Sequence, residues 1–262
     1  MAKPKQPVMV PIHDPKWVNR RCRELAGRLN LGCRVWYKED GQSFLMLGSK
    51  TPAKNGQKKV YLSAGIHGDE PGSVLGLIEW LGQSDRWMSR FHFTIFPCLN
   101  PWGLKSNSRH DSEHRDLNRC YAREDVPSIV AHREVIKEGG PYDLALMLHE
   151  DYDAEGMYVY EVSSDPQVWG HELIGAASGL IPPDPRVRIE GRTANRGVLK
   201  RNLKSKAWQS RFKNWGFPEA VHLYMHHCPR VYTLETPSEM DIHLRAKAHV
   251  LAVNKALEMV HR

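Results

Sequence analysis

The chain has 262 residues, of which 41% are hydrophobic and 26% are charged, so it holds enough apolar material for a sizeable core. Its formal net charge of +7 favours anionic partners, but it identifies none of them. The five cysteines form no C-x-x-C pair, which argues against a disulfide framework and a cysteine zinc site. No apolar run approaches the roughly 20 residues of a membrane span, and the amino-terminal residues lack an apolar signal core, so we expect a cytoplasmic protein.

The first part of the chain alternates predicted helices and strands. Asp14-Pro15 is typical of a helix start, and apolar residues at helical spacing predict a helix that ends near Gly32. A strand pair, a polar loop, a buried strand, a helix and an aromatic strand are predicted next. The strands and the helix are expected at 34–38, 43–48, 59–64, 72–81 and 91–98.

The remainder continues the same alternation. Residues 100–118 are polar and are expected to form a loop, and Ser238 with Asp241 resembles a capping box that opens a final helix. Between them, helices are expected at 128–137 and 168–180, and strands at 143–148, 157–162 and 231–234. The pattern predicts one α/β domain over residues 1–262, a three-layer α/β/α sandwich with a mixed, mostly parallel twisted sheet.

The stretch 59–71 places possible metal ligands directly after a strand. It begins as an apolar run, breaks at Gly65, and then offers His67 and Glu70 before Pro71, which suits the first turn of a helix. An imidazole and a carboxylate on one tight turn can chelate a single zinc ion. In open α/β sheets, ligands bind at the carboxyl ends of strands.

Two more polar groups follow short apolar runs, and these groups are His149 and Glu235. If the strands share one sheet, all of the groups point into one crevice. His67, Glu70 and His149 are then the ligand set of a hydrolytic zinc site with one position open for water. Glu235 would lie close to the metal without binding it.

Five motifs occur in an order that resembles a known family. They are Gly65-Ile-His-Gly-Asp-Glu70, Asn100-Pro-Trp-Gly103, Asp116-Leu-Asn-Arg119, Leu148-His149 and Tyr232-Thr-Leu-Glu235. Together they resemble the zinc carboxypeptidase family, near its bacterial murein-peptide amidase branch and the related succinylglutamate desuccinylase/aspartoacylase branch. The motifs lie within residues 60–240, which is most of the chain.

The resemblance implies one zinc ion per chain, with His67, Glu70 and His149 as its ligands and Glu235 as the general base. Zinc lowers the pKa of a bound water to roughly 7, which provides a nucleophile at neutral pH. A carboxylate can take the proton of that water and later deliver it to the leaving amine.

Other matches concern the substrate. Asn118 and Arg119 match the pair that holds the substrate carboxylate, and a guanidinium can grip a carboxylate through two parallel hydrogen bonds. Arg109 matches the arginine that polarises the scissile carbonyl and stabilises its oxyanion. Tyr224 is a candidate for the mobile tyrosine of the carboxypeptidases, although its spacing to Glu235 is short, and a core or surface tyrosine is an alternative.

Two charged stretches remain open to interpretation. Residues 186–213 contain ten Lys/Arg and one acid, Glu190, with Trp208 and Trp215 in and just beyond them. They could form a solvated basic face, a subsite for an anionic substrate or a nucleic-acid groove. The acidic run 150–155 could be a solvated loop, a subsite for a basic group or a site for a second cation.

The motifs therefore predict a zinc metallohydrolase that cleaves a C-terminal peptide or γ-glutamyl amide bond. A deacylase of N-acyl amino acids is the alternative, although only 27 residues follow Glu235 and the resemblance implies a further β-rich domain in that group. A non-enzymatic zinc-binding or nucleic-acid-binding module is disfavoured, because ligands, base and carboxylate-binding arginine are all present. The expected partner is a peptide or N-acyl amino acid with a free carboxylate, and neither a membrane nor nucleic acid.

Overall fold

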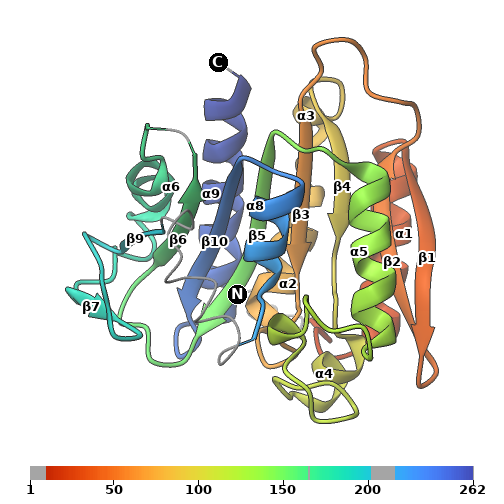
Figure 1. Ribbon diagram of the computed structural model, residues 1–262, viewed down its shortest axis with the longest axis horizontal. Helices are drawn as coiled ribbons and strands as arrows, with labels where there is room; N and C mark the ends of the chain where they lie inside the picture. The colour runs from red at the N-terminus through yellow and green to blue at the C-terminus, as the bar shows by residue number, and fades with distance from the viewer. Residues whose placement is uncertain (1–9, 165, 202–215, 262) are drawn as a thin grey trace, which may run out of the picture.

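An eight-stranded twisted sheet forms the centre of the computed structural model, which describes residues 10–164, 166–201 and 216–261 (Figure 1). The strands are β1 (Leu31–Glu39), β2 (Gln42–Ser49), β3 (Lys59–Ala64), β4 (His92–Phe96), β5 (Leu144–Asp151), β6 (Tyr158–Ser163), β7 (Arg188–Ile189), β8 (Arg192–Thr193), β9 (Val198–Arg201) and β10 (Arg230–Pro237). The helices are α1 (Pro15–Arg28), α2 (Pro71–Leu81), α3 (Asp85–Met88), α4 (Pro101–Ser106), η1 (Leu117–Arg119), α5 (Pro127–Gly139), α6 (Gly170–Ala177), α8 (Glu219–His226) and α9 (Ile242–His261).

The order of strands in the sheet is β1-β2-β4-β3-β5-β10-β6-β9, and β7 and β8 pair separately. Four of the neighbouring pairs are parallel and three are antiparallel, so the predicted mixed, mostly parallel sheet is confirmed. The chain leaves β3 for β4 on one side and returns to place β5 on the other side. This reversal is a topological switch point, where open α/β sheets bind their ligands.

Helices cover both faces of the sheet. Figure 1 shows α5 and α8 in front of it and α1, α2 and α9 behind it. Successive residues of β3 serve the two layers, because Tyr61 packs with α5 and α8 while Leu62 packs with α1, α2 and α9. Both side chains are 0% exposed. A strand that is buried on both faces reads as a continuous apolar run, which explains the sequence of this strand.

Most of the predicted elements are present, and three details differ. Residues 100–118 contain the short helix α4 and the start of η1, because Asn100 caps α4 by accepting the Gly103 N–H at 2.8 Å. His149 and Glu235 lie inside β5 and β10, since the pairing of these two strands continues to their ends at Asp151 and Pro237.

The expected capping box at the last helix is wrong. Asp241, and not Ser238, caps α9, and its Oδ1 accepts the N–H groups of His243 and Leu244 at 2.9 and 3.2 Å. The twenty-residue α9 then packs along α2 and α6. No helix among the described residues is long and apolar enough to cross a membrane.

A buried chain of hydrogen bonds connects α5 to β3. The His132 ring lies between two phenols, with Nδ1 2.8 Å from the Tyr121 hydroxyl and Nε2 3.1 Å from the Tyr61 hydroxyl. The Tyr61 hydroxyl donates to Glu219 Oε1 at 2.5 Å. All hydrogen bonds in this series form when Tyr121 donates to His132 Nδ1 and His132 Nε2–H donates to Tyr61. This arrangement requires a neutral imidazole. Burial lowers the pKa of His132 to about 3, with a smaller effect of His222, and this keeps the imidazole neutral.

We expect His132 to make the fold sensitive to acid. Between pH 6.5 and about 3 the unfolded chain protonates this residue and the folded protein does not, so the free energy of unfolding falls as pH falls. The slope from this one group is at most about 1.4 kcal/mol per pH unit. His132→Gln keeps a donor and an acceptor but does not titrate. Urea unfolding at pH 7 and pH 5 should show a smaller loss of stability in the variant, and an equal loss in both proteins would contradict the assignment.

Candidate metal centre and substrate pocket

The turn between β3 and α2 is shaped by two glycines. Gly65 has a φ of +63°, a left-handed conformation that side chains disfavour, and a Cβ there would lie 2.7 Å from the Val74 side chain. Gly68 lies against the backbone of Gly103, where a Cβ would come within 1.9 Å of the carbonyl carbon. The turn therefore packs backbone to backbone on the α4 loop, and this contact fixes His67 between the two glycines.

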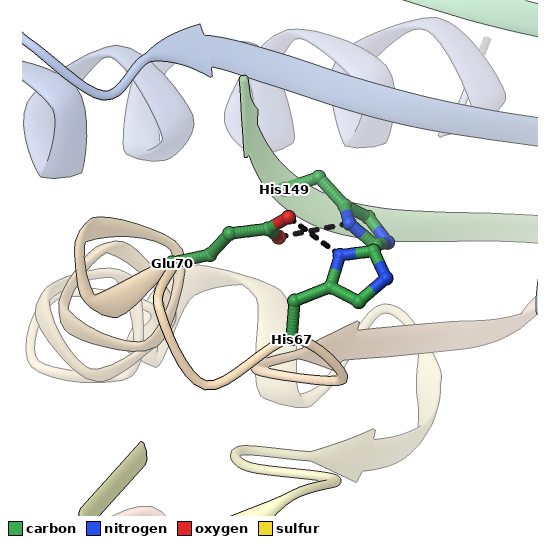
Figure 2. A group of neighbouring side chains, drawn as sticks. All are labelled: His67, Glu70 and His149. Carbon is green, nitrogen blue, oxygen red and sulfur yellow. Dashed lines mark hydrogen bonds and ion pairs between the residues drawn. The ribbon is translucent and has the colours of Figure 1, made fainter. Parts of the chain in front are cut away.

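Three side chains meet where β3 and β5 end and α2 begins. His67 Nδ1 lies 2.5 Å from Glu70 Oε1, and His149 Nδ1 lies 2.9 Å from Glu70 Oε2 (Figure 2). One ligand atom from each residue lies within 4.8 Å of the others, and all three residues are buried. No other group of three His, Cys, Asp or Glu side chains in the described part of the chain comes this close.

The arrangement fits a divalent cation. Glu70 Oε2 is buried and makes no properly directed hydrogen bond despite its short distance to His149. Burial alone would raise the pKa of the Glu70 carboxyl, but the imidazoles of His67 and His149 reverse this and hold the pKa below its ordinary value. The carboxylate is therefore anionic. Two imidazole nitrogens and one carboxylate are the ligand type of catalytic zinc sites.

Asp116 is a functional candidate that the sequence reasoning missed. Its Oδ1 lies 3.2 Å from His67 Nε2, the ring nitrogen that faces away from Glu70. Metal-binding histidines commonly donate their second N–H to a carboxylate, which fixes the tautomer and the ring orientation. Asp116 is the first residue of the Asp-Leu-Asn-Arg motif, so a signal was present in the sequence. The family resemblance by itself implies roles only for the Asn and Arg of this motif.

Arg109 lies beside the candidate metal ligands. Its Nε and Nη2 donate to Asp116 Oδ2 at 3.1 and 2.9 Å. Its Nη1 lies 3.3 Å from His67 Nδ1 and 3.9 Å from Glu70 Oε1. Asp116 therefore holds both the imidazole and the guanidinium, and it sets the distance between them.

The predicted carboxylate-binding pair follows Asp116 directly. Asn118 Oδ1 accepts the backbone N–H of Glu219 at 3.0 Å, and Arg119 Nη1 donates to the Asn118 carbonyl at 2.9 Å. The Asn118 oxygen is thereby occupied, which leaves its NH₂ as the group that can donate to a substrate. The Glu219 carboxylate accepts the hydroxyls of Tyr61 and Ser63, so the start of α8 is fixed to β3. Sequence reasoning did not identify Glu219.

Glu235 lies next to His149 in the sheet, in the neighbouring parallel strand β10. It is 8% exposed. Burial raises the pKa of Glu235 well above its ordinary value, the charges of Glu70 and Asp151 add to this, and His149 opposes it. A raised pKa makes a carboxylate a stronger proton acceptor, which suits the role of a general base.

A cavity of about 220 Å³ brings the predicted residues together. Its lining includes all seven of the residues predicted for the site: His67, Glu70, Arg109, Asn118, Arg119, His149 and Glu235. Arg192 and Arg201 of the basic stretch also line it, whereas residues 202–215 lie outside the described part of the chain. Tyr224 is half-buried against the α5–α8 layer and does not line the cavity.

The first residue of the acidic run 150–155 is buried and contributes to the packing of the fold. Glu150 is 5% exposed, and it accepts the Gly72 N–H at 2.9 Å and an Arg245 N–H at 2.8 Å. Burial raises the pKa of Glu150 to about 7, while Arg245 opposes this. Its carboxyl fixes the first turn of α2 to α9, so it is not a solvated loop residue.

Comparisons with known proteins found one matching family model and several structures with the same fold. Residues 56–138 match the family model of the succinylglutamate desuccinylase/aspartoacylase catalytic domain. No curated protein sequence matches the chain. The fold is similar to that of a candidate metallopeptidase from Shewanella amazonensis, with a TM-score of 0.82 and 20% identity over 95% of this chain and 94% of the other.

Two further structures share the fold. A metallo-carboxypeptidase from Pseudomonas aeruginosa, in complex with (2-guanidinoethylmercapto)succinic acid, has a TM-score of 0.63 and 17% identity over 93% of this chain and 69% of the other. Carboxypeptidase A from Helicoverpa armigera has a TM-score of 0.68 and 13% identity over 98% and 76%. The predicted resemblance to zinc carboxypeptidases, near the desuccinylase and aspartoacylase branch, is confirmed, and the comparisons support the prediction of a metallohydrolase.

We expect Asp116 to tune metal binding through His67. Asp116→Ala should weaken zinc affinity by about 10- to 100-fold, because the imidazole loses the partner that fixes its tautomer and orientation. Competition with a chromophoric chelator measures this affinity. Asp125→Ala is the matched control, since Asp125 forms an exposed ion pair with Arg123 outside the cavity. Equal affinity in Asp116→Ala and the unmodified protein would remove Asp116 from the site.

Proposed function

We propose that the chain is a zinc-dependent metallocarboxypeptidase or amidase that hydrolyses a C-terminal peptide or γ-glutamyl amide bond. His67, Glu70 and His149 are the proposed zinc ligands, and Glu235 is the proposed general base. The observation that carries this function is the shared cavity, in which the buried carboxyl of Glu235 and the side chains of Asn118 and Arg119 lie with the three residues that could hold a metal ion. The matching family model and the metallo-carboxypeptidase folds support it.

A zinc ion held by the three ligands would supply Lewis-acid chemistry and lower the pKa of water to roughly 7. Glu235 takes the proton from the attacking water and returns it to the leaving nitrogen. Its place beside His149 puts the carboxylate on the same edge of the sheet as the ligands. Burial raises the pKa of Glu235, which makes its carboxylate a stronger proton acceptor for the first of these transfers.

Arg109 and the Asn118–Arg119 pair bind the substrate in this proposal. The guanidinium of Arg109, fixed by Asp116, stabilises the negative charge that develops on the scissile carbonyl oxygen. Arg119 and the NH₂ of Asn118 hold the free carboxylate of the released residue. Holding the carboxylate orients the scissile bond, and such orientation lowers the barrier before any chemical step.

A deacylase of N-acyl amino acids is the second candidate. The family model that matches residues 56–138 favours it, because that model describes a desuccinylase and aspartoacylase domain. The same ligands, base and carboxylate-binding pair would serve either reaction. A panel of a C-terminally free peptide, a γ-glutamyl peptide and an N-acyl amino acid, each with and without chelator, distinguishes them by which amide is cleaved.

Glu235→Gln should keep the metal and lose hydrolysis. The amide cannot accept the proton, so we expect kcat to fall by about 10²- to 10⁴-fold. Metal analysis should give the same zinc content as the unmodified protein, because Glu235 is not a ligand in this proposal. Glu155→Gln, at an exposed position outside the cavity, is the matched control. Full activity in Glu235→Gln would refute the proposed mechanism, and loss of zinc would make Glu235 a ligand.

A further inference from the structure

Helix α2 begins at a candidate metal ligand that does not cap it. Glu70 occupies the N-cap position, yet its side chain accepts no hydrogen bond from the described backbone of the first turn. An N-cap side chain ordinarily accepts the N–H of the second or third helical residue, which has no partner inside the helix. The carboxylate oxygens of Glu70 lie instead beside His67 and His149. The start of the helix therefore requires an acceptor from elsewhere.

Glu150 supplies that acceptor from β5. Its Oε2 accepts the N–H of Gly72, the second residue of α2, at 2.9 Å. A Cβ at Gly72 would lie 2.3 Å from Glu150 Oε1, so glycine allows the carboxylate to come this close. Ser73 completes the turn, because its hydroxyl donates to the Glu70 carbonyl at 2.6 Å. The backbone of Glu70 is thus held by its neighbours while its side chain remains with the two imidazoles.

The same carboxyl group also contacts the strand of the proposed base. Thr236 pairs with Glu150 across β10 and β5, as Glu235 pairs with His149 one position earlier. Successive side chains of a strand point to opposite faces, so Glu150 and Thr236 lie on the face that α2 and α9 cover (Figure 1). Thr236 Oγ1 lies 3.4 Å from Glu150 Oε1. One carboxyl group therefore joins the ends of both strands to the turn that carries Glu70.

Arg245 of α9 holds this carboxyl group in place. Its Nη1 donates to Glu150 Oε1 at 2.8 Å, and the side chains of Arg245 and Glu150 are 10% and 0% exposed. A pair buried in this way is screened much less than a surface pair, and removal of one partner leaves an uncompensated charge. Helices α2 and α9 also pack closely at Gly76, where a Cβ would lie 2.8 Å from the Cβ of His249. The ion pair therefore connects the turn to a tightly packed helix.

We propose that Glu150, held by Arg245, is a positioning residue of the metal centre. It caps α2 in place of Glu70, so the Glu70 side chain is free to face a metal ion. Without this cap, the unpaired N–H at the helix start would compete with the ion for the Glu70 carboxylate. The role rests on the proposed function, because it takes His67, Glu70 and His149 as the metal ligands. Glu150 is then neither a substrate subsite nor a ligand of a second cation.

Glu150→Gln tests this role in the zinc-loaded protein. The amide has the same shape, but its NH₂ group cannot accept the N–H of Gly72 or of Arg245, so one of these contacts is lost. Zinc affinity, measured under native conditions by competition with a chromophoric chelator, should fall by about 10- to 100-fold. With zinc saturating, kcat should fall by about tenfold. KM should change little, because Asn118 and Arg119 are held by other contacts.

Glu161→Gln is the matched control. Glu161 is 0% exposed, and it caps α6 from β6 by accepting the N–H groups of Trp169 and Gly170 at 3.3 and 2.9 Å. It is outside the described lining of the cavity, so this variant should lose stability in urea but keep its zinc affinity and kcat. A Glu150→Gln protein that behaves in the same way would make Glu150 a structural residue and overturn the proposal.

A second variant keeps the test decisive if Glu150→Gln does not fold. Arg245→Met removes the cation and leaves the Gly72 contact, so zinc affinity should fall by less than about tenfold. Cobalt(II) in place of zinc gives visible absorption bands that report on ligand geometry, and Arg245→Met should shift these bands. Unchanged zinc affinity together with an unchanged cobalt spectrum would overturn the proposal.

Metal binding separates this role from the proposed reaction. If no substrate in the panel is cleaved but Glu150→Gln binds zinc more weakly than Glu161→Gln, the hydrolase function fails and the positioning role remains. If a substrate is cleaved and Glu150→Gln matches the unmodified protein in zinc affinity and kcat, the positioning role is wrong and the proposed function remains.

Discussion

The carboxylate of Glu70, held between the imidazoles of His67 and His149, is the interaction on which the site depends. All three side chains are almost completely buried. Burying an anion costs free energy unless opposite charge or hydrogen-bond donors surround it. A cation bound by the three ligand atoms would offset this cost. The three side chains converge only because β3 and β5 are neighbours at the switch point of the sheet. Metal binding and sheet topology are therefore linked.

The polar loop after β4 connects this cluster to the substrate groups. It is tied to the turn that carries His67, because the Asn100 N–H donates to the Gly65 carbonyl and Gly68 packs on Gly103. Asp116 near its end then contacts both His67 and Arg109. A displacement of the loop would thus move a candidate ligand and two candidate substrate-binding groups together. Caps and backbone contacts set the geometry here together with buried apolar side chains of the loop, such as Leu104 and Leu117.

Charge is distributed unevenly along the cavity. Carboxylates lie near Glu235, where burial and mutual repulsion raise the pKa of this residue. Guanidinium groups lie at both ends, with Arg109 beside the candidate metal ligands and Arg201 over the Tyr160 ring. The sequence gathers basic residues into one stretch, and among those at positions 186–201 the fold brings Arg192 and Arg201 to the cavity, whereas Lys200 is exposed and does not line it. The basic composition therefore indicated which stretch of the chain could reach the cavity, whereas the tertiary structure determines which of its described residues line the cavity.

The sequence by itself determined the buried strands, the glycine-bounded turn and the candidate ligands, because these depend on local residue patterns and on short sequence motifs. It also predicted the layered α/β fold, since both faces of strands such as β3 are apolar. Only the tertiary structure showed that Asp116 supports His67, that Glu219 orients Asn118, and that Arg201 lines the cavity. These contacts join residues up to 101 positions apart, and no local pattern encodes which distant strand or helix will supply the partner. The capping of α9 by Asp241 was also decided by the structure, because two hydrogen-bonding residues competed for one helix start.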